Sequence, residues 1–583
     1  MHKKRAKKDS VFTDLIKDAE TANGRDIVQT PLLAIIVATF LDRLNFVSFI
    51  NSVLKWDEKQ WRVSPGNLAK AIILTPFLCI GARIPLYSIH ENFQSVDMSL
   101  LFEDKVEAEW LTRDALACLL DRFYEAGCEH IFTQIALKVY DVFNIPFQTV
   151  FHGDTTTFVL YGKYKNADPD VDDVAAPARG FSKAGKRNLK QVLLGMITDN
   201  FGIPLSISVR SGNQNDSKWN RAIIDTLGDL VKTATTTVTY IADSKLTTAP
   251  NLKKLIKNGF QFVSLCPANF EQKLSARVVK SAYTTNDWTY IGTYRKSKMG
   301  KLVEYEAQEF IESVCGTLCR LLVLRSSEKK KEAVTVLEKE KDEIKKLINA
   351  SMEKEFFCEA DAKKEVVSLL KSLKNRVWTM QCKLVTKDVE PKKRPVGRPR
   401  KNTPILPKSL MWKIEAGDLI VRQEKYNLML WRNESFVLIT NVMSDHTPTV
   451  EILHLYKEQK TIKDNFSVLK RPAMVDTLFM KLPKRIVALI TLLSFALLIQ
   501  VVIRILVQRN LDAMVEKPGI DHSGKPIARI GLKKIIRFLG YYTVISEDGV
   551  RRYTCKTKKH RPHLKTWLKL LEIDKFLDID ITI

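Results

Sequence analysis

The spacing of hydrophobic positions changes along the 583-residue chain and divides it into regions of different structure. Between residues 30 and 145 apolar residues recur at helical spacing, as in PLLAIIVATFLDRLNFVSFI. Ser64-Pro65-Gly66 supplies a cap and a first-turn proline for one of these helices. The pattern predicts an α-helical N-terminal domain over residues 30–145, preceded by a basic tail over residues 1–29.

From about Phe147 the pattern changes to short runs rich in β-branched and aromatic residues. These runs are FHGDTTTFVLYG, VLLGMIT, IPLSISV, VTYIA and FQFVSL, with the helical stretch NRAIIDTLGDLV between the third and fourth. Strands that first follow one another directly and are later joined by helices indicate a mixed α/β sheet. We expect its first part over residues 146–270 and its second part over residues 441–510.

Residues 271–440 interrupt this pattern. Two amphipathic stretches, residues 329–350 and 362–373, predict a helical hairpin. The segment PKKRPVGRPRKNTP that follows is too rich in proline and cations for regular structure, so we expect a loop. Short strands are predicted for residues 418–442, and a helix from residue 449 to about 470.

The run IVALITLLSFALLIQVV, residues 486–502, is near the lower limit of length for a membrane helix. Its polar residues Ser494 and Gln500 and its basic flanks permit either a membrane span or a buried core helix. We expect a core helix, because the rest of the chain alternates short strands and amphipathic helices as soluble proteins do. A basic C-terminal tail over residues 511–583 is predicted to follow. The basic N-terminus lacks the apolar stretch and cleavage site of a secretory signal.

The net charge of the chain indicates what kind of partner it binds. It has 92 Lys and Arg against 66 Asp and Glu, a net charge of +26 and a pI near 9.5. Such a protein is suited to meet a polyanion, with nucleic acid the first choice and an anionic membrane surface the second. The nine cysteines are scattered, and Cys315-x3-Cys319 has no second pair to complete a zinc site. We therefore expect reduced thiols in an intracellular protein.

Two aspartates have the surroundings of metal ligands. Asp154 in FHGDTTTF and Asp243 in TYIADSKLTT each end or interrupt a strand-like run and precede Thr or Ser. Phosphoryl transfer on DNA uses two divalent ions about 4 Å apart, held by carboxylates. Taken singly, an aspartate at a strand end is more often a turn or helix-cap residue.

The order of the segments adds a family resemblance. HGDTTTFVLYG, then RGFSKAGKRNLKQVLLGMITDNFGIPLSISVRSGNQND, then YIADSKLTTAPNLKKLIKNGFQFVSLCP resembles bacterial DDE-type insertion-sequence transposases. These belong to the IS-four-like superfamily, whose third acid lies in a Tyr-Arg-Glu-Lys signature, and the resemblance covers residues 30 to 540. It implies a ribonuclease-H-like core with Asp154 on the first strand and Asp243 on the fourth, binding Mg²⁺ or Mn²⁺. It also implies that residues 271–440 are an insertion between the second and third acids.

The resemblance further implies a DNA transposase that cleaves phosphodiesters and transfers strands at the ends of its element. Its partners would be double-stranded DNA, at element ends and target, and a second copy of the chain on that DNA, with no membrane. Its location would be the bacterial cytoplasm, at the nucleoid.

The signature helix departs from the family. The spacing Y-x2-R-x3-E-x6-K maps onto Tyr456, Gln459, Lys463 and Lys470, so Lys463 stands at the third-acid position. A protonated lysine has no lone pair for a metal ion and would repel it. Tyr456 and Lys470, by resemblance, would contact backbone phosphate.

Glu458 and Asp464 are the nearest carboxylates and the candidate substitute acids. On one continuous helix they point about 140° and 100° away from position 463. Lys463 could also be a solvated residue on a helix unrelated to any site. The alternative function is thus a catalytically inactive, transposase-derived DNA-binding protein, and a third is a membrane protein based on residues 486–502 alone.

The segment PVGRPRK resembles an AT-hook, whose cations enter the narrow minor groove of A·T-rich DNA. The DNA-binding candidates are Arg398 and Arg400 of this segment and Arg394 directly before it. The alternative is a solvated basic linker, since short basic, proline-rich loops are common.

Overall fold

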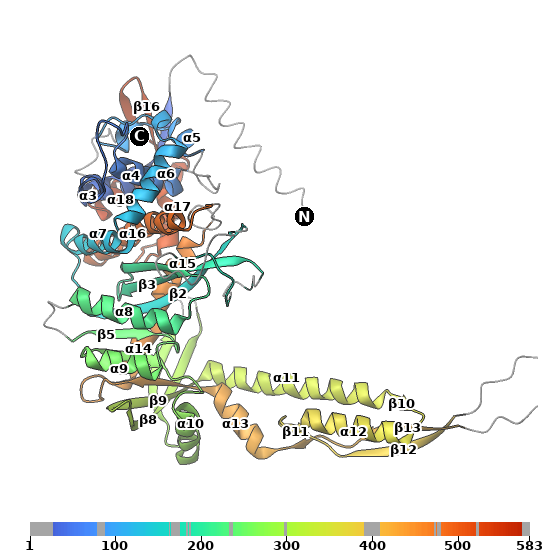
Figure 1. The fold of residues 1–583 in the computed structure, drawn as a ribbon. Coiled ribbons are helices and arrows are strands. Elements are labelled where there is room, and N and C mark those ends of the chain that lie inside the picture. Colours follow the sequence, from blue (N-terminus) through green and yellow to red (C-terminus); the bar gives the residue numbers. More distant parts are fainter. Residues whose placement is uncertain are drawn as a thin grey trace, which may run out of the picture. The chain divides into compact units, whose positions relative to one another are not determined.

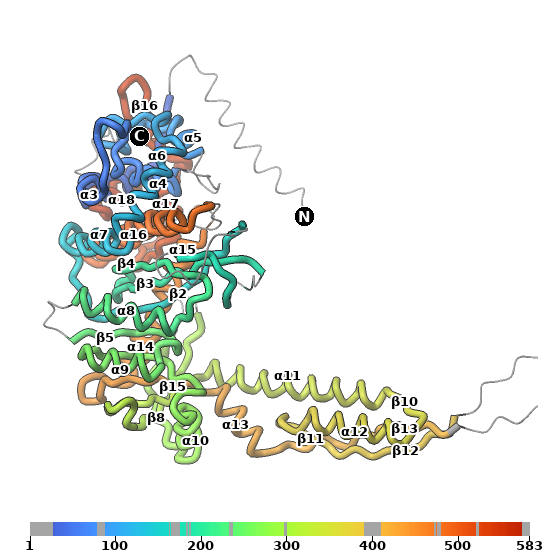
Figure 2. The backbone as a smooth tube through the Cα atoms, viewed as in Figure 1, coloured from blue at the N-terminus to red at the C-terminus, as the bar shows by residue number. Residues whose placement is uncertain are grey.

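The structure is a computed structural model that describes residues 27–78, 88–162, 164, 175–181, 185, 188–231, 237–295, 300–389, 409–471, 474, 480–520 and 524–573. The chain divides into two compact units (Figures 1 and 2). Unit 1 contains Met1–Lys245, Asn258–Phe260 and Lys457–Ile583, and unit 2 contains Leu246–Lys257 and Gln261–Tyr456. Each unit thus contains segments that are distant in the sequence.

The first part of unit 1 is helical. Its helices are α2 (Leu32–Arg43), α3 (Phe46–Val53), α4 (Pro65–Leu78), α5 (Ile89–Phe93), α6 (Arg113–Glu125) and α7 (Cys128–Val142), with the short 3-10 helices η2 (Met98–Leu100) and η3 (Ala108–Trp110). The predicted start of α4 is present, because the Ser64 hydroxyl accepts a hydrogen bond from the Asn67 amide at 3.3 Å. Helix α6 is capped in the same way by Thr112, which accepts from the Ala115 amide at 3.2 Å.

Helix α16 (Pro483–Ala513) contains the apolar run and lies in the core of unit 1. It packs against α2, α4, α6 and α7. Its apolar window is long enough to cross a membrane, but all of it is buried inside the protein. A helix that is apolar on every side is stable when surrounded by other elements, as here.

Four neighbouring strands of unit 1 have the order β4-β3-β2-β5. They are β2 (Val150–Leu160), β3 (Lys190–Asp199), β4 (Pro204–Ser211) and β5 (Thr239–Ala242), with helix α8 (Asp216–Val231) between the last two in sequence. β2 and β4 each pair antiparallel with β3, whereas β2 and β5 are parallel. The β3–β4 turn uses Gly202 at φ +81°, and the buried Asp199 carboxylate accepts the Ile203 amide at 2.7 Å.

The predicted helix over residues 449 to 470 is two helices. α14 (Thr449–Glu458) ends one residue before α15 (Lys460–Leu469), and Gln459 forms the break. The angles computed for one continuous helix therefore do not apply to Glu458, which lies before the break. They still apply to Asp464, which shares α15 with Lys463.

The last described residues of the basic C-terminal segment are folded. They form α17 (Leu532–Leu539), β16 (Tyr542–Glu547), β17 (Val550–Cys555), η4 (Lys558–His563) and α18 (Leu564–Leu570). β16 pairs with β17 on one side and with the N-terminal strand β1 (Val28–Pro31) on the other, so both ends of the described chain share a sheet.

Asp97 joins this sheet to the helical part of unit 1. Its carboxylate accepts hydrogen bonds from the Ser546 hydroxyl at 2.8 Å and from Arg551 Nε at 3.0 Å. It also accepts from the Ser99 amide at 3.1 Å, while the Asp97 amide donates to the Thr30 hydroxyl at 2.9 Å. Burial raises the pKa of Asp97, but the hydrogen bonds from Ser99, Ser546 and Arg551 outweigh burial and lower the pKa below its usual value.

Five neighbouring strands of unit 2, each antiparallel to the next, have the order β6-β15-β9-β8-β7. They are β6 (Gln261–Leu265), β7 (Thr289–Arg295), β8 (Leu302–Val314), β9 (Thr317–Ser326) and β15 (Ser435–Thr440), with helices α9 (Ala249–Lys257) and α10 (Leu274–Thr285). The buried Arg320 on β9 forms an ion pair with Glu309 at 2.8 Å and donates to the Thr447 carbonyl. This residue joins the sheet to the loop before α14.

The insertion contains the predicted helical hairpin, α11 (Ser327–Met352) and α12 (Glu359–Leu373), drawn side by side in Figure 1. Ser351 contacts Glu365 at 2.9 Å and Arg376 contacts Glu343 at 3.5 Å, so the chain returns antiparallel along α11. The short strands of this part are β10 (Glu355–Phe356), β11 (Trp378–Thr379), β12 (Cys382–Val389), β13 (Ser409–Ala416) and β14 (Ile420–Val421). A separate apolar core holds it together, formed by Leu337, Ile344, Ile348, Leu369, Leu373, Val377, Trp378 and Met380.

The prediction of strands throughout residues 418–442 is wrong for its middle part. Helix α13 (Gln423–Glu434) lies there, between β14 and β15. Tyr426, Met429 and Leu430 recur at helical spacing and pack on the apolar core of the insertion. The high β-propensity of the flanking residues concealed this spacing, since tertiary packing outweighs local propensity.

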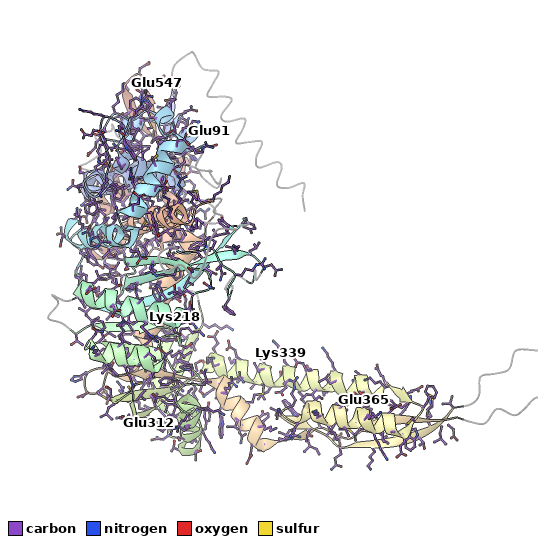
Figure 3. All side chains as sticks on the ribbon, viewed as in Figure 1. Glu91, Lys218, Glu312, Lys339, Glu365 and Glu547 are labelled. Carbon is purple, nitrogen blue, oxygen red and sulfur yellow. The ribbon has the colours of Figure 1, made fainter. Side chains whose placement is uncertain are left out.

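Asp97→Asn should lower the free energy of unfolding of unit 1 by about 1–3 kcal/mol near neutral pH, because the hydrogen bonds to Ser546 and Arg551 lose their charged acceptor. Since the folded pKa lies below the unfolded one, this stabilisation is present above the unfolded pKa and is lost as the pH falls through the folded pKa. Urea denaturation of both proteins should therefore show a difference that shrinks toward acid. Glu91→Gln, at an exposed residue labelled in Figure 3, is the control and should leave the urea midpoint unchanged. Equal midpoints for Asp97→Asn and the unmodified chain near neutral pH would contradict this role.

Candidate active site

Asp154 and Asp243 are neighbours across two parallel strands. Gly153 of β2 pairs with Ala242, the last residue of β5, so the next positions on the two strands are Asp154 and Asp243. Adjacent strands lie about 4.8 Å apart. The register therefore brings together two aspartates that are far apart in the sequence.

Local hydrogen bonds orient both carboxylates. Asp154 Oδ1 accepts from the Thr155 amide at 2.8 Å, and Asp243 Oδ1 accepts from the Lys245 amide at 2.9 Å. Both side chains are half-buried. Each aspartate thus has a defined direction beside the other without being enclosed in the core.

Tyr240 lies beneath the two aspartates and is fully buried. Its hydroxyl donates to Asn220 Oδ1 on α8 at 2.9 Å. Burial raises the pKa of Tyr240 well above its usual value, and the negative charges of Asp243 and Asp154 raise it further. Both carboxylates therefore lie near this one hydroxyl group, which stays protonated.

Gly153 makes the position of Tyr240 sterically allowed. A Cβ atom at residue 153 would lie 1.9 Å from the Tyr240 hydroxyl oxygen. No side chain larger than hydrogen fits there without moving the ring. Sequence reasoning did not assign roles to Tyr240, Gly153 or Asn220, although the glycine directly before Asp154 was a visible signal.

Helix α15 lies over the sheet face that carries Asp154. Asn465 on α15 contacts the sulfur of Met196 at 4.0 Å, and Met196 is the cross-strand partner of Asp154. Partners across a strand pair project from the same face. The Lys470 ammonium lies 5.9 Å from the ring of Phe158, four residues after Asp154 on that face.

The structure places Lys463, the residue expected at the third-acid position, on the surface. Lys463 is exposed on α15, and Asp464 beside it is exposed as well. Burial lowers the pKa of Arg504 on α16, and the charges of Asp199 and Asp464 partly offset this effect. The charge of Asp464 therefore acts on Arg504 of α16.

The other candidates have different positions. Glu458 is half-buried at the end of α14, and Tyr456 is a half-buried residue of α14 and the last residue of unit 2. Arg394, Arg398 and Arg400 lie outside the described residues.

A divalent cation fits the pair of aspartates. Mg²⁺ prefers carboxylate oxygens and is commonly held by one or two carboxylates together with water and substrate phosphates. Within the part of the chain that the structure describes, no three His, Cys, Asp or Glu side chains gather closely enough to hold a metal ion. The pair is thus the acidic core of the candidate site.

Comparison with known proteins adds the family. Residues 154–499, more than half of the chain, match the family described as Transposase DDE domain, and the match begins at Asp154 itself. The chain belongs to the DDE transposase family. Residues 32–137 match a Domain of unknown function (DUF4277). A search of curated proteins finds no match.

Among solved structures, this DDE transposase is similar to the piggyBac transposase synaptic complex with hairpin DNA, determined by cryo-electron microscopy. The sequence identity is 10% and the TM-score 0.37, with 88% of this chain and 79% of the other covered. The DDE transposase family generally uses divalent metal ions. The mixed α/β architecture expected from the sequence is present in both units.

Gly153→Ala should displace Tyr240, break its bond to Asn220 and lower the free energy of unfolding by about 1–3 kcal/mol. Tyr240→Leu removes the ring that the new methyl group would meet. If this contact is the cause, the costs of Gly153→Ala and Tyr240→Leu should be less than additive in the double variant, measured by urea denaturation. Additive costs would mean that Gly153 serves another purpose.

Proposed function

We propose that this chain is a DNA transposase of the IS-four-like superfamily, whose Asp154 and Asp243 hold the divalent ion used in phosphodiester cleavage and strand transfer. The observation that carries the proposal is the parallel register of β2 and β5, which sets the two aspartates side by side. The family match supports DNA as the substrate. The basic composition supports the same partner.

A ribonuclease-H-like core is the proposed fold of the catalytic domain. Counting from β2, Asp154 lies on the first strand of the unit 1 sheet and Asp243 follows the fourth. This is the arrangement that the family resemblance implies. The proposed domain boundaries remain residues 146–270 and 441–510, with residues 271–440 as the insertion.

The chain's own residues would have separate tasks in the reaction. A bound Mg²⁺ or Mn²⁺ would supply Lewis-acid stabilisation of charge at the scissile phosphate. Asp154 and Asp243 would hold that ion, with their orientation set by the Thr155 and Lys245 amides. Tyr240, which stays protonated, would keep both strands in place from beneath.

DNA contacts are proposed for residues outside the acidic pair. Lys470 lies on the face that carries Asp154 and suits contact with a backbone phosphate near the cut. Tyr456 is proposed for the same task, and Arg394, Arg398 and Arg400 for the minor groove of A·T-rich DNA. Assembly of two copies on paired element ends, at the bacterial nucleoid, completes the proposal.

A second candidate function is a catalytically silent descendant that binds element ends without cutting them. Lys463 at the third-acid position favours it, because a lysine cannot replace a carboxylate ligand. According to this second candidate, the chain as it stands binds DNA and cleaves it poorly.

The unmodified chain should show little or no Mg²⁺-dependent nicking of duplex DNA, and Lys463→Glu should raise the nicking rate roughly hundredfold or more. The reason is that the new carboxylate supplies metal-based charge stabilisation of several kcal/mol, and each ~1.4 kcal/mol is tenfold in rate. Conversion of supercoiled plasmid to its nicked form measures this rate. Asp154→Asn added to Lys463→Glu should abolish the gain.

Lys460→Glu is the matched control, since it makes the same charge change at another exposed residue of α15. It should leave nicking unchanged. Efficient cleavage by the unmodified chain that disappears in Asp464→Ala or Glu458→Ala would show that the third acid has moved to one of these residues.

A further inference from the structure

The C-terminal module, residues 524–573, has an extreme charge. It contains 13 Lys and Arg against three Asp and Glu, and all of its residues are described. Most of these cations are exposed, including Lys533, Lys534 and Arg537 on α17. Ile535, Phe538 and Leu539 form the buried side of that helix. The charges therefore lie on a folded surface rather than along an extended tail.

An aromatic core fixes the elements of the module to one another. Phe538 of α17 lies 5.3 Å from the ring of His560 in η4 and 6.0 Å from the ring of Trp567 in α18. The Tyr542 hydroxyl donates to the His560 carbonyl at 2.6 Å. His560, Trp567 and Tyr542 are all nearly inaccessible to solvent.

Tyr541 connects the basic end of α17 to the basic segment after β17. Arg537 Nε donates to the Tyr541 hydroxyl at 3.2 Å, and the Tyr541 ring stacks on His560 at 4.9 Å with an angle of 7° between the planes. The Lys556 amide donates to the Tyr541 carbonyl at 2.9 Å. The Tyr541 platform is defined here as five exposed cations: Arg537 and Lys556, which bond to Tyr541, and Lys558, Lys559 and Arg561 of η4, the helix that contains His560.

The three acids of the module lie at other positions along the chain than the platform residues. Glu547, labelled in Figure 3, and Asp548 lie at the turn of the β16–β17 hairpin, five residues along β16 from Tyr542. This is about 17 Å at the usual rise of a strand. It exceeds the screening length of about 10 Å at 0.1 M salt. Glu572 forms an ion pair with Arg509 of α16 at 2.6 Å.

We propose that the Tyr541 platform is a docking surface for the phosphate backbone of duplex DNA, independent of base sequence. Fixed, exposed cations on a rigid scaffold neutralise phosphates and release their counterions, which makes binding steeply salt-dependent. The surface would hold DNA against unit 1 through contacts that fix position rather than specify sequence. This inference rests on the proposed DNA-transposase function.

The test compares two quadruple variants of the full chain. One carries Arg537→Gln, Lys558→Gln, Lys559→Gln and Arg561→Gln. The control carries Lys339→Gln, Lys341→Gln, Lys345→Gln and Lys346→Gln, which remove the same charge from exposed positions of α11. The control helix carries nearly balanced charge, with seven lysines and six acids in Ser327–Met352.

Fluorescence anisotropy of labelled A·T-rich and G·C-rich duplexes over a range of salt is the measurement. The platform variant should lose roughly tenfold or more in affinity, and its slope of log affinity against log salt should fall by about 3–4, at about 0.9 per phosphate contact. The loss should be equal on both duplexes, because backbone contacts carry no sequence information. The α11 control should change the slope by less than about 1.

Two outcomes overturn the platform proposal alone while DNA binding itself stands. The first is unchanged DNA affinity in the platform variant. The second is an equal loss of DNA affinity in the platform variant and the α11 control, which would mean that only the net charge of the chain matters. Absence of DNA binding by the unmodified chain would overturn the proposed function as well. The last measurement compares binding of the unmodified chain to duplex DNA with its binding to vesicles of phosphatidylserine and phosphatidylcholine. Preference for the vesicles would mean that the platform binds a membrane surface instead of DNA.

Discussion

The parallel register between β2 and β5 is the constraint on which the candidate site depends. It pairs Gly153 with Ala242, so the next residue on each strand is an aspartate. Tyr240 occupies the space that a side chain at residue 153 would fill, and its hydroxyl group bonds to Asn220 of α8. A shift of one residue would separate the two carboxylates, because neighbouring residues of a strand project from opposite faces. Gly153, Tyr240 and Asn220 thus fix the positions of the two aspartates, and none of the three is proposed to hold the metal ion.

Unit 1 supports this sheet from both ends of the sequence. Helix α16 lies in the core among α2, α4, α6 and α7, and its Arg504 donates to the Phe201 carbonyl in the β3–β4 turn. The same turn holds α15, because Asn465 donates to the Gly202 carbonyl at 2.8 Å. The position of Lys463 is therefore set by the core rather than by the site. Lys463 is exposed on a well-anchored helix, so a change of its side chain should leave the fold intact.

The sequence predicted the N-terminal helices, the mixed sheet, the helical hairpin and the buried apolar helix, because each has strong periodicity or length. It also predicted Asp154 and Asp243 as a pair, through their strand-end positions and the family resemblance. It could not predict that Tyr240 fills the space above Gly153, because that contact exists only after the strands pair. Pairing of β1 with β16 joins opposite ends of the chain and leaves no local signal. The break at Gln459 and the helix α13 were missed because continuous patterns of apolar residues fit either description.

Metal binding by the two aspartates is the central claim, and a titration of Mn²⁺ into the full chain tests it most directly. Electron paramagnetic resonance of the free ion gives the number of ions bound. The account predicts that Asp154→Asn and Asp243→Asn each lose the same ion, whereas Asp464→Asn keeps it. Equal numbers of bound Mn²⁺ ions and equal affinities in the unmodified chain and both variants would contradict the account, because the register of β2 and β5 would then serve the fold alone.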